Sequence, residues 1–273
     1  MGQCKTDWYN VLVLEVLEVL DLYHDSFYRF VQVEDPQQLA SELQDLCVQS
    51  QLLGSILVAS EGINGMLAGT QGNLDAFWNT LHADPRFAGL QAKRSPSSEM
   101  PFKRLKIKVK PELVPLGIEG VDASSKTGVQ VPPDQWLNLI QQQDVVLLDN
   151  RNDFEARIGT FEGAINPGVK KFRDFAKYVL DHQKEWEGKR IAMFCTGGIR
   201  CEKASAWMLD LGMEVYQLEG GIMNYFLTGP EQHDGWTGEC FVFDHRVTLD
   251  GGLEESDLSF QDVNTQFGDG VKS

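Results

Sequence analysis

Short, continuously apolar segments in the second half of the chain constrain its fold more than any other feature. The segments 145–148 (Val-Val-Leu-Leu) and 191–194 (Ile-Ala-Met-Phe) contain no polar residue. A strand without polar alternation is buried on both faces, as the strands of parallel sheets are. An amphipathic helical segment at 134–142 precedes the first of these strands, others follow at 172–184 and 202–211, and another strand follows at 215–218. This alternation predicts an α/β domain with a doubly wound parallel sheet.

The first half of the chain has a different order of elements. Two helices are indicated, one that begins at Pro36 and one at 73–81. Strands are indicated at 26–33, 55–59 and 66–68, and extended stretches around 87–93 and 104–109. The order β-α-β-β-α-β predicts a ferredoxin-like α+β domain.

Changes in composition suggest where the domains begin and end. Pro, Gly, Ser and Asp are concentrated in 111–130, which we interpret as a linker. We expect an irregular extension at 1–25, the ferredoxin-like domain at 26–110, and the parallel-sheet domain with a C-terminal extension at 131–249. The last segment, 250–273, has few apolar residues and is predicted to be disordered.

Cysteine usage and hydropathy restrict where the protein acts. The five cysteines are an odd number without a Cys-x-x-Cys pair, which excludes a disulfide framework and a zinc ribbon and favours a reducing compartment. No segment approaches the ~18 apolar residues of a membrane span. We therefore expect a cytoplasmic protein that does not contact a membrane. Gly2 and Cys4 formally match an acylation pattern, but a loose N-terminus is the favoured interpretation.

The segment Cys195-Thr196-Gly197-Gly198-Ile199-Arg200 is the strongest candidate for a reactive site. Cys195 follows a buried strand, and a helix begins a few residues later, so the thiol is predicted at the carboxyl edge of the sheet, where ligands bind. Two glycines let successive amides point at one centre, and the helix N-terminus and Arg200 add positive charge. This arrangement favours a nucleophilic thiolate. The alternative is a buried structural cysteine beside a glycine-rich turn.

Several sequence strings resemble known families. Several strings resemble a rhodanese domain, namely Leu148-Asp149-Asn150-Arg151, Phe154-Glu155, Gly163-Ala164-Ile165-Asn166-Pro167, the Cys195 loop and Leu218-Glu219-Gly220-Gly221-Ile222. Longer strings around Cys195, with Glu61-Gly62-Ile63-Asn64-Gly65, Pro101-Phe102-Lys103-Arg104-Leu105-Lys106 and Gly238-Glu239-Cys240-Phe241-Val242-Phe243-Asp244, resemble the tRNA uridine hydroxylase (TrhO) family. The resemblance runs from about residue 27 to 248 and implies a ferredoxin-like, acylphosphatase-like domain before a rhodanese domain.

The resemblance also implies a reaction: O2-dependent hydroxylation of the wobble uridine in the tRNA anticodon loop at C5, with Cys195 as the essential residue. No cofactor or metal site is evident in the sequence, and no obligate protein partner is expected. His82 and Asp84 have the spacing of an iron ligand pair, but no convincing distal histidine accompanies them.

Binding to RNA requires positive charge, and the chain as a whole carries a formal charge of −16. Cations nevertheless cluster between 93 and 110, and on the predicted strand 104–109 they alternate with apolar residues, so they share one face. An ordinary solvated sheet edge is the alternative. With the resemblance, we assign RNA binding to Arg94, Lys103, Arg104, Lys106 and Lys108.

Three further residues are predicted to support the loop. Asp149 and Arg151 lie at the end of a core strand, and we expect charge-assisted hydrogen bonds from them to the loop. Cys201 is either a resolving thiol for an oxidised Cys195 or a packing residue that faces away. The packing interpretation is favoured, because the first residue of a helix tends to face away from the loop.

Two other functions remain open at this stage. A thiosulfate-type sulfurtransferase would carry a persulfide on Cys195, but the first domain has no evident use in that reaction. A non-catalytic RNA-binding or regulatory module is disfavoured by the intact loop from Cys195 to Arg200.

Overall fold

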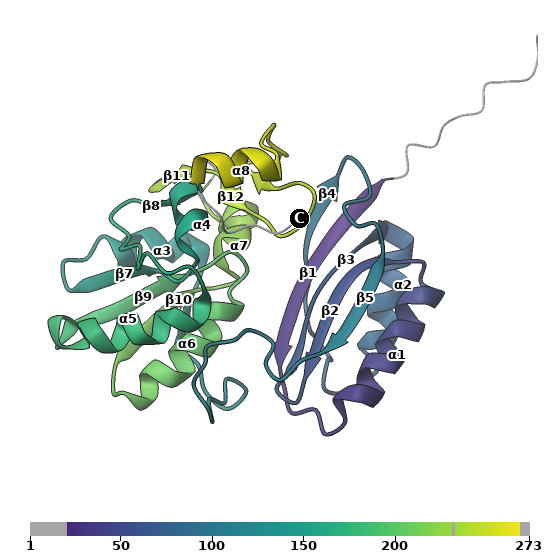
Figure 1. Cartoon of the computed structure of the whole chain (residues 1–273), viewed down its shortest axis with the longest axis horizontal. Helices are drawn as coiled ribbons and strands as arrows, with labels where there is room; N and C mark the ends of the chain where they lie inside the picture. The colour runs from purple at the N-terminus through teal and green to yellow at the C-terminus, as the bar shows by residue number, and fades with distance from the viewer. Residues whose placement is uncertain (1–20, 231–232, 268–273) are drawn as a thin grey trace, which may run out of the picture.

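The computed structural model describes residues 21–230 and 233–267, which form two α/β domains that lie side by side (Figure 1). Gly2 and Cys4 lie outside the described residues. None of the helices within the described ranges is long and apolar enough to cross a membrane.

The N-terminal domain is one sheet with two helices. Its strands run in the spatial order β4-β1-β3-β2-β5, in which only β5 and β2 are parallel neighbours. The first four have the order of a ferredoxin-like domain, so this predicted fold is confirmed. The elements are β1 (Leu22–Phe30), α1 (Pro36–Gln49), β2 (Leu53–Ala59), β3 (Gly62–Thr70), α2 (Gln71–Leu81), β4 (Lys93–Ser97) and β5 (Leu105–Val109).

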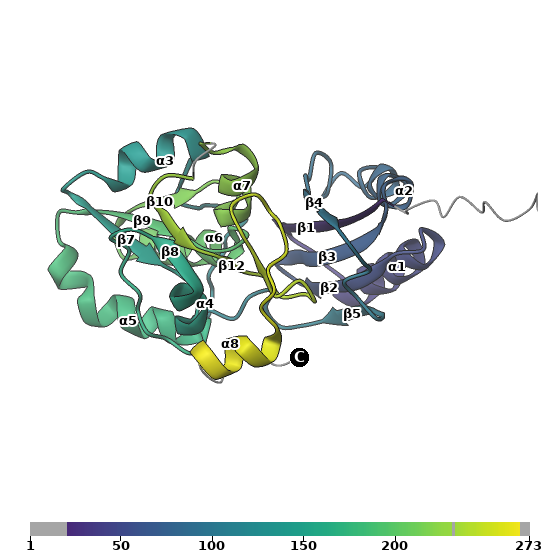
Figure 2. The same ribbon diagram turned by 90° about the horizontal axis from the view of Figure 1, so that it is seen from above.

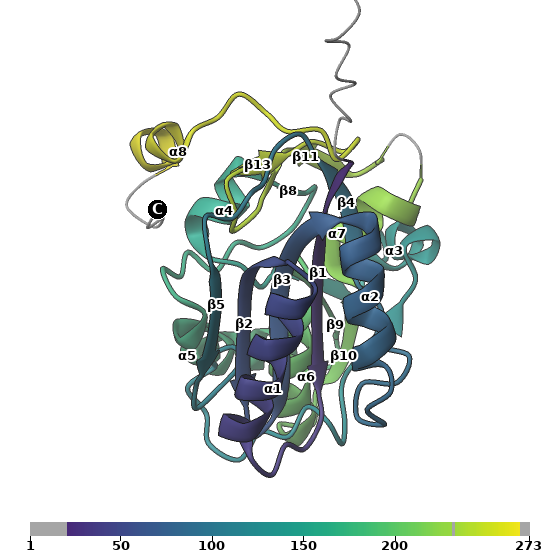
Figure 3. The ribbon, with the colours of Figure 1, turned by 90° about the vertical axis from the view of Figure 1, so that its right-hand side faces the viewer.

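The domain's own helices cover only one face of this sheet. Leu39 and Leu43 of α1 and Leu74 and Phe77 of α2 are buried against it. The opposite face turns toward the second domain (Figures 1 and 3). Because side chains alternate along a strand, every second residue of β1, β3 and β4 faces that domain.

Two expectations for this domain are wrong in detail. β1 begins at Leu22, inside the segment expected to be an irregular extension. The stretch 87–93, expected to be extended, is a turn at 87–89 and has no regular secondary structure at 90–92. Its apolar Phe87 and Leu90 are nevertheless buried in the core, which explains the misleading pattern. The strand begins instead at Lys93, and it tolerates Pro96 because β4 lies at the sheet edge.

The second domain contains the predicted parallel sheet, in the order β6-β10-β9-β7. Helices α5 and α6 pack on one face, and α3 and α7 pack on the other, as a doubly wound sheet requires (Figure 2). The elements are β6 (Val129–Val131), α3 (Pro133–Ile140), β7 (Val145–Asp149), α4 (Asp153–Ile158), β8 (Gly159–Phe161), α5 (Phe175–His182), β9 (Arg190–Phe194), α6 (Ile199–Asp210), β10 (Glu214–Leu218) and α7 (Gly221–Thr228). Short 3-10 helices, η1 (Phe172–Asp174) and η2 (Gln183–Trp186), flank α5.

The C-terminal segment is ordered further than the sequence indicates. It contains β11 (Trp236–Gly238), β12 (Cys240–Phe241), β13 (Thr248–Leu249) and α8 (Phe260–Phe267). The expectation of disorder from residue 250 is therefore wrong for the described part of that segment. Val263 of α8 is fully buried in a cluster with Phe154 and Phe241. Apolar residues are few here but recur at helical spacing, which an average over composition does not register.

Polar contacts and a small apolar cluster that includes Phe30 of the first domain and Ala206 of the second hold the two domains together. The Lys203 ammonium, on α6, forms ion pairs with Glu61 of the first domain (2.8 Å) and Glu112 of the connecting segment (2.7 Å). Near the other end of the interface, Arg246 Nη1 donates to Ser95 Oγ (2.7 Å). The domains are thus held at two separated points, and a cleft lies between them.

Candidate active site

Cys195 lies on the floor of the cleft between the domains. It follows β9, an inner strand of the parallel sheet, and its side chain is fully buried from bulk solvent. The cavity above it measures about 370 Å³. Its walls come from both domains and include Tyr28, Asn64 and Lys93 of the first domain and Thr196 and Met223 of the second.

The main chain of the loop is arranged around the sulfur. The Gly198 amide donates a hydrogen bond to Cys195 Sγ (N···S 3.1 Å), from a backbone with φ +99° that favours glycine. The start of α7 holds the loop from behind, since the Ile222 amide donates to the Cys195 carbonyl (3.0 Å). At Gly221, which also has a positive φ, a Cβ would stand 2.4 Å from that carbonyl, so only glycine fits.

The loop stabilises the ionised form of the thiol. Burial alone would raise the pKa of Cys195, but a hydrogen bond from the Cys201 thiol, the charge of Arg200 and the amides of Cys201 and Gly198 lower it to about 5. The N-terminus of α6 also points at the sulfur, which favours negative charge there. Cys195 is therefore a thiolate at neutral pH.

Cys201 faces the reactive sulfur, so the expectation that it points away is wrong. Both side chains are buried in the same cluster, and Cys201 donates to Cys195. The pKa of Cys201 lies well above its usual value because of burial and the neighbouring Cys195 thiolate. Asn150 Nδ2 lies 3.9 Å from Cys201 Sγ on its other side. Cys201 thus stays protonated and serves as a hydrogen-bond donor to the thiolate.

Arg200 is held by a carboxylate that the sequence analysis did not assign to the site. Its guanidinium makes two parallel hydrogen bonds to Glu155, at 2.7 and 2.8 Å, and both side chains are buried. Despite burial, the charge of Arg200 keeps the pKa of Glu155 below its usual value. Glu155 lies three residues after Asn152, a spacing typical of a helix capping box. In the sequence this spacing indicates a role at the helix end and gives no sign of the ion pair with Arg200.

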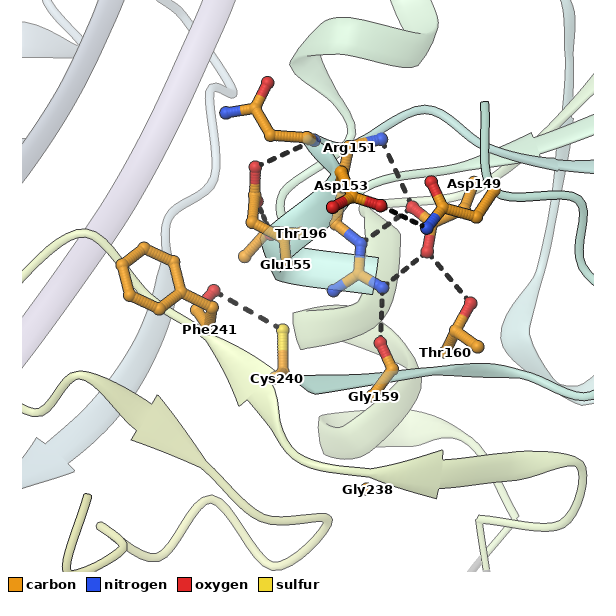
Figure 4. Close-up of polar contacts among 12 residues, drawn as sticks. Asp149, Arg151, Asp153, Glu155, Gly159, Thr160, Thr196, Gly238, Cys240 and Phe241 are labelled. Carbon is orange, nitrogen blue, oxygen red and sulfur yellow. Dashed lines mark hydrogen bonds and ion pairs between the residues drawn. The ribbon is translucent and has the colours of Figure 1, made fainter. Parts of the chain in front are cut away.

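Asp149 and Arg151 do not bond to the loop as expected. Arg151 Nε and Nη2 donate to the two carboxylate oxygens of Asp149 (2.8 and 2.6 Å), and Nη2 also donates to the Gly159 carbonyl (Figure 4). Thr160 Oγ1 donates to the same carboxylate. These bonds tie β7 to β8 around the start of α4, so the pair positions the helix that carries Glu155 and supports the loop only through it.

The predicted RNA-binding cations divide into two groups. Arg94 is excluded, because its guanidinium is paired with Asp25 (2.8 Å) and Asp75 (2.8 Å) on the helix side of the sheet. The other members are exposed and make none of the ion pairs found in the described part of the chain. Three of them line a groove beside the cleft, namely Lys103, Arg104 and Lys106, and Lys108 follows on the same face of β5.

Tyr28 and Lys93 of the first domain were not assigned to the active site from the sequence, although Lys93 belongs to the cation cluster between 93 and 110. They lie on adjacent strands, far from Cys195 along the chain, and line the same cavity. Only the packing of the sheet face against the loop brings them there, so no local sequence signal could have indicated that position.

Metal ligation has no evident location among the residues described. They include no cluster of three or more His, Cys, Asp or Glu side chains suited to a metal ion. The His82 ring nitrogen contacts the Leu90 carbonyl, and Asp84 is paired with Arg86.

Comparisons with known proteins agree with this architecture. Residues 24–113 match the UPF0176 acylphosphatase-like domain, and residues 132–227 match the rhodanese-like domain. The chain is 48% identical over 230 residues to the tRNA uridine(34) hydroxylase of Picosynechococcus sp.. The aligned residues cover 84% of this chain and 77% of that protein. It is 44% identical to the enzyme so named in Bartonella bacilliformis (85% and 76% covered) and 45% identical to that in Teredinibacter turnerae (84% and 72%).

Proposed function

This chain belongs to the tRNA uridine(34) hydroxylase family, and from that premise we propose that it hydroxylates the wobble uridine of tRNA at C5, with the Cys195 thiolate as the essential group and O2 as the oxidant. The observation that carries this proposal is a thiolate on the floor of a cavity that two domains enclose.

A buried thiolate restricts how the substrate reaches it. The base must leave its stack and enter the cavity, while the rest of the RNA stays outside. Extruding a base costs least when it is already single-stranded. The anticodon loop offers such a base, so an anticodon-loop uridine suits this cavity better than a uridine within a duplex.

A groove suited to single-stranded RNA lies beside the cavity. Met66, Phe243 and Asp244 line both the groove and the cavity, so the two are adjacent. The groove combines the unpaired cations of the 103–106 segment with aromatic rings, which is the usual combination for binding single strands. The rings are Phe102, Phe243 and Phe260, and Phe243 is 51% exposed.

The pairing of the strands places cations at both ends of this path. One row of directly paired residues crosses the sheet on the face toward the cleft, in the order Lys93, Ser26, Met66, Ser55 and Lys106. Lys93 lines the cavity, and Lys106 lines the groove. In a chain with a net charge of −16, the cations of the groove, which have no carboxylate partners among the described residues, favour a polyanionic substrate there.

The decisive test uses purified protein and an unmodified tRNA transcript with uridine at position 34. We expect nucleoside mass spectrometry to show one added oxygen at that uridine under air, none without O2, and isotope incorporation from labelled O2. Cys195→Ser should give no product. Absence of product with wild-type protein under air and a reductant, together with sulfur transfer from thiosulfate to Cys195, would instead support the sulfurtransferase.

A further inference from the structure

Lys93 is the cation of the N-terminal domain that lies inside the active-site cavity. It is the first residue of β4 and pairs with Ser26 of β1, and its side chain lines the same cavity as Cys195. Its ammonium lies 5.3 Å from the centre of the Tyr28 ring. The ring face offers a cation–π contact that stabilises the ammonium group and leaves its positive charge in place.

Tyr28 reaches the reactive loop, and Lys93 reaches the start of α7 behind it. A Cβ at Gly198 would stand 2.8 Å from Tyr28 Oη, and Gly198 is the residue whose amide donates to Cys195 Sγ. A Cβ at Gly220 would stand 3.0 Å from Lys93 Cε, and Gly220 immediately precedes α7, whose first turn holds the loop. The first domain therefore meets the loop where glycines leave room for these two side chains.

Half-buried Lys93 differs from the buried cations near the cleft in having no carboxylate partner within the described part of the chain. Arg200, Lys203 and Arg246 each have a carboxylate partner, whereas Lys93 makes none of the ion pairs among residues 21–230 and 233–267. Burial lowers the pKa of Lys93, and the negative charges of Cys195 and Glu202 act against that shift. Lys93 therefore presents to the cavity a cation that no described side-chain carboxylate neutralises by direct contact, on the side that faces the thiolate.

We propose that Lys93 is a catalytic residue of the hydroxylation proposed above: its ammonium contacts O4 of the bound uracil and stabilises the negative charge that forms there when Cys195 adds to C6. In this step the Sγ–C6 bond forms, the C5–C6 π pair shifts to C5–C4, and the C4–O4 π pair moves onto O4. Lys93 donates a hydrogen bond to that oxygen or transfers its proton to it. No oxidant takes part in the addition, and C5 becomes electron-rich, as a carbon that is to react with O2 must be.

The test compares Lys93→Met, which keeps the length of the side chain, with Lys93→Arg, which keeps the charge, and with Lys189→Met, an exposed control on the far side of the second domain. On an anticodon stem-loop, Lys93→Met should lower kcat by about 10²–10³-fold, the usual effect of losing one donor to a developing oxyanion. Lys93→Arg should recover part of that loss. In a Cys195→Ser background, the affinity of Lys93→Met for tRNA should stay within about twofold, so the loss belongs to the chemical step.

A second measurement does not depend on turnover. The pH midpoint for alkylation of Cys195 by iodoacetamide should rise in Lys93→Met, since the thiolate loses a facing cation, and stay unchanged in Lys189→Met. If circular dichroism shows that Lys93→Met is unfolded, Lys93→Gln replaces it in both measurements. A kcat within threefold of wild type, or a loss that lies entirely in tRNA affinity, overturns the proposal. If wild-type protein makes no hydroxyuridine, the proposed function fails, and an unchanged alkylation midpoint then also rejects a role for Lys93 at Cys195.

Discussion

The two domains contribute to the cleft in opposite ways. The rhodanese-like domain supplies its part from one continuous stretch, 195–201, in which main-chain amides, a helix N-terminus and a second thiol surround Cys195. The N-terminal domain supplies single side chains from separate strands, such as Lys93 on β4 and Lys106 on β5. Local backbone geometry thus creates the reactive group, whereas the packing of a sheet face creates the wall that meets the substrate.

This comparison leads to a pattern that mutations can test. Changes in the loop should remove turnover and leave tRNA binding intact. Changes on β5, the outer strand of the first domain that is farther from the loop, should weaken binding and leave the turnover of bound tRNA intact. Changes at the contacts between domains should reduce stability.

The largest effect is expected for Cys195→Ser. Serine keeps nearly the same volume but is not ionised at neutral pH, so hydroxylation should fall by at least about 10³-fold. Binding of tRNA, measured by fluorescence anisotropy, should stay within twofold of wild type. A parallel loss of binding would show that the Cys195 loop also contributes to tRNA binding.

The next largest effect is expected for Glu155→Gln. It leaves the buried Arg200 guanidinium without its counter-charge, and removing one partner of a buried pair costs about 3–5 kcal/mol. Urea unfolding should show this loss, and Glu162→Gln, at an exposed position in the same domain, should show almost none. Equal stability of the two variants would mean that Glu155 does not hold Arg200 in solution.

The contact between the domains should weaken in acid because of His24. This side chain is buried, with Nε2 3.2 Å from Asp244 Oδ2, and burial together with the charge of Arg246 lowers its pKa to about 4. Between that value and about 6.5, the unfolded chain binds a proton that the folded chain does not, so the free energy of unfolding decreases as the pH falls. The contribution of His24 over this window is about 3 kcal/mol.

Urea titrations across this pH range test the assignment. His24→Gln should flatten the pH dependence of stability, while His245→Gln, at an exposed histidine, should leave its slope as in wild type. An unchanged slope in His24→Gln would show that other groups cause the acid sensitivity.

The smallest effect is expected on the outer strand. Lys106→Gln combined with Lys108→Gln removes two unpaired cations and should weaken tRNA binding roughly tenfold at low salt. The slope of log affinity against log salt should become shallower by about 1–2, as expected for two lost phosphate contacts. Lys184→Gln combined with Lys189→Gln changes the net charge equally on a remote surface and should alter neither. Equal slopes in both double variants would exclude the groove as the path of the RNA.

Sequence reasoning succeeded where the physical signal is local. The parallel sheet and the Cys195 loop could be predicted because an apolar strand, two glycines and a helix start are neighbours along the chain. The contacts of Glu155 and Lys93 could not, since they depend on which faces of α4 and β4 meet the loop. Arg94 and Lys93 illustrate the limit: they are adjacent in sequence, but the pleat of β4 places one against Asp25 and the other in the cavity.

The row of paired residues from Lys93 to Lys106 also has a fixed length. Hydrogen bonds keep neighbouring strands about 4.8 Å apart, so the Cα atoms at its two ends, four strand spacings apart, are separated by about 19 Å. Surface loops can vary without changing this length. On the RNA path proposed above, a strand bound at Lys106 has to span this length to bring a nucleotide to the thiolate. The length of the row, rather than the bases along it, would then set which nucleotide of the bound strand meets Cys195.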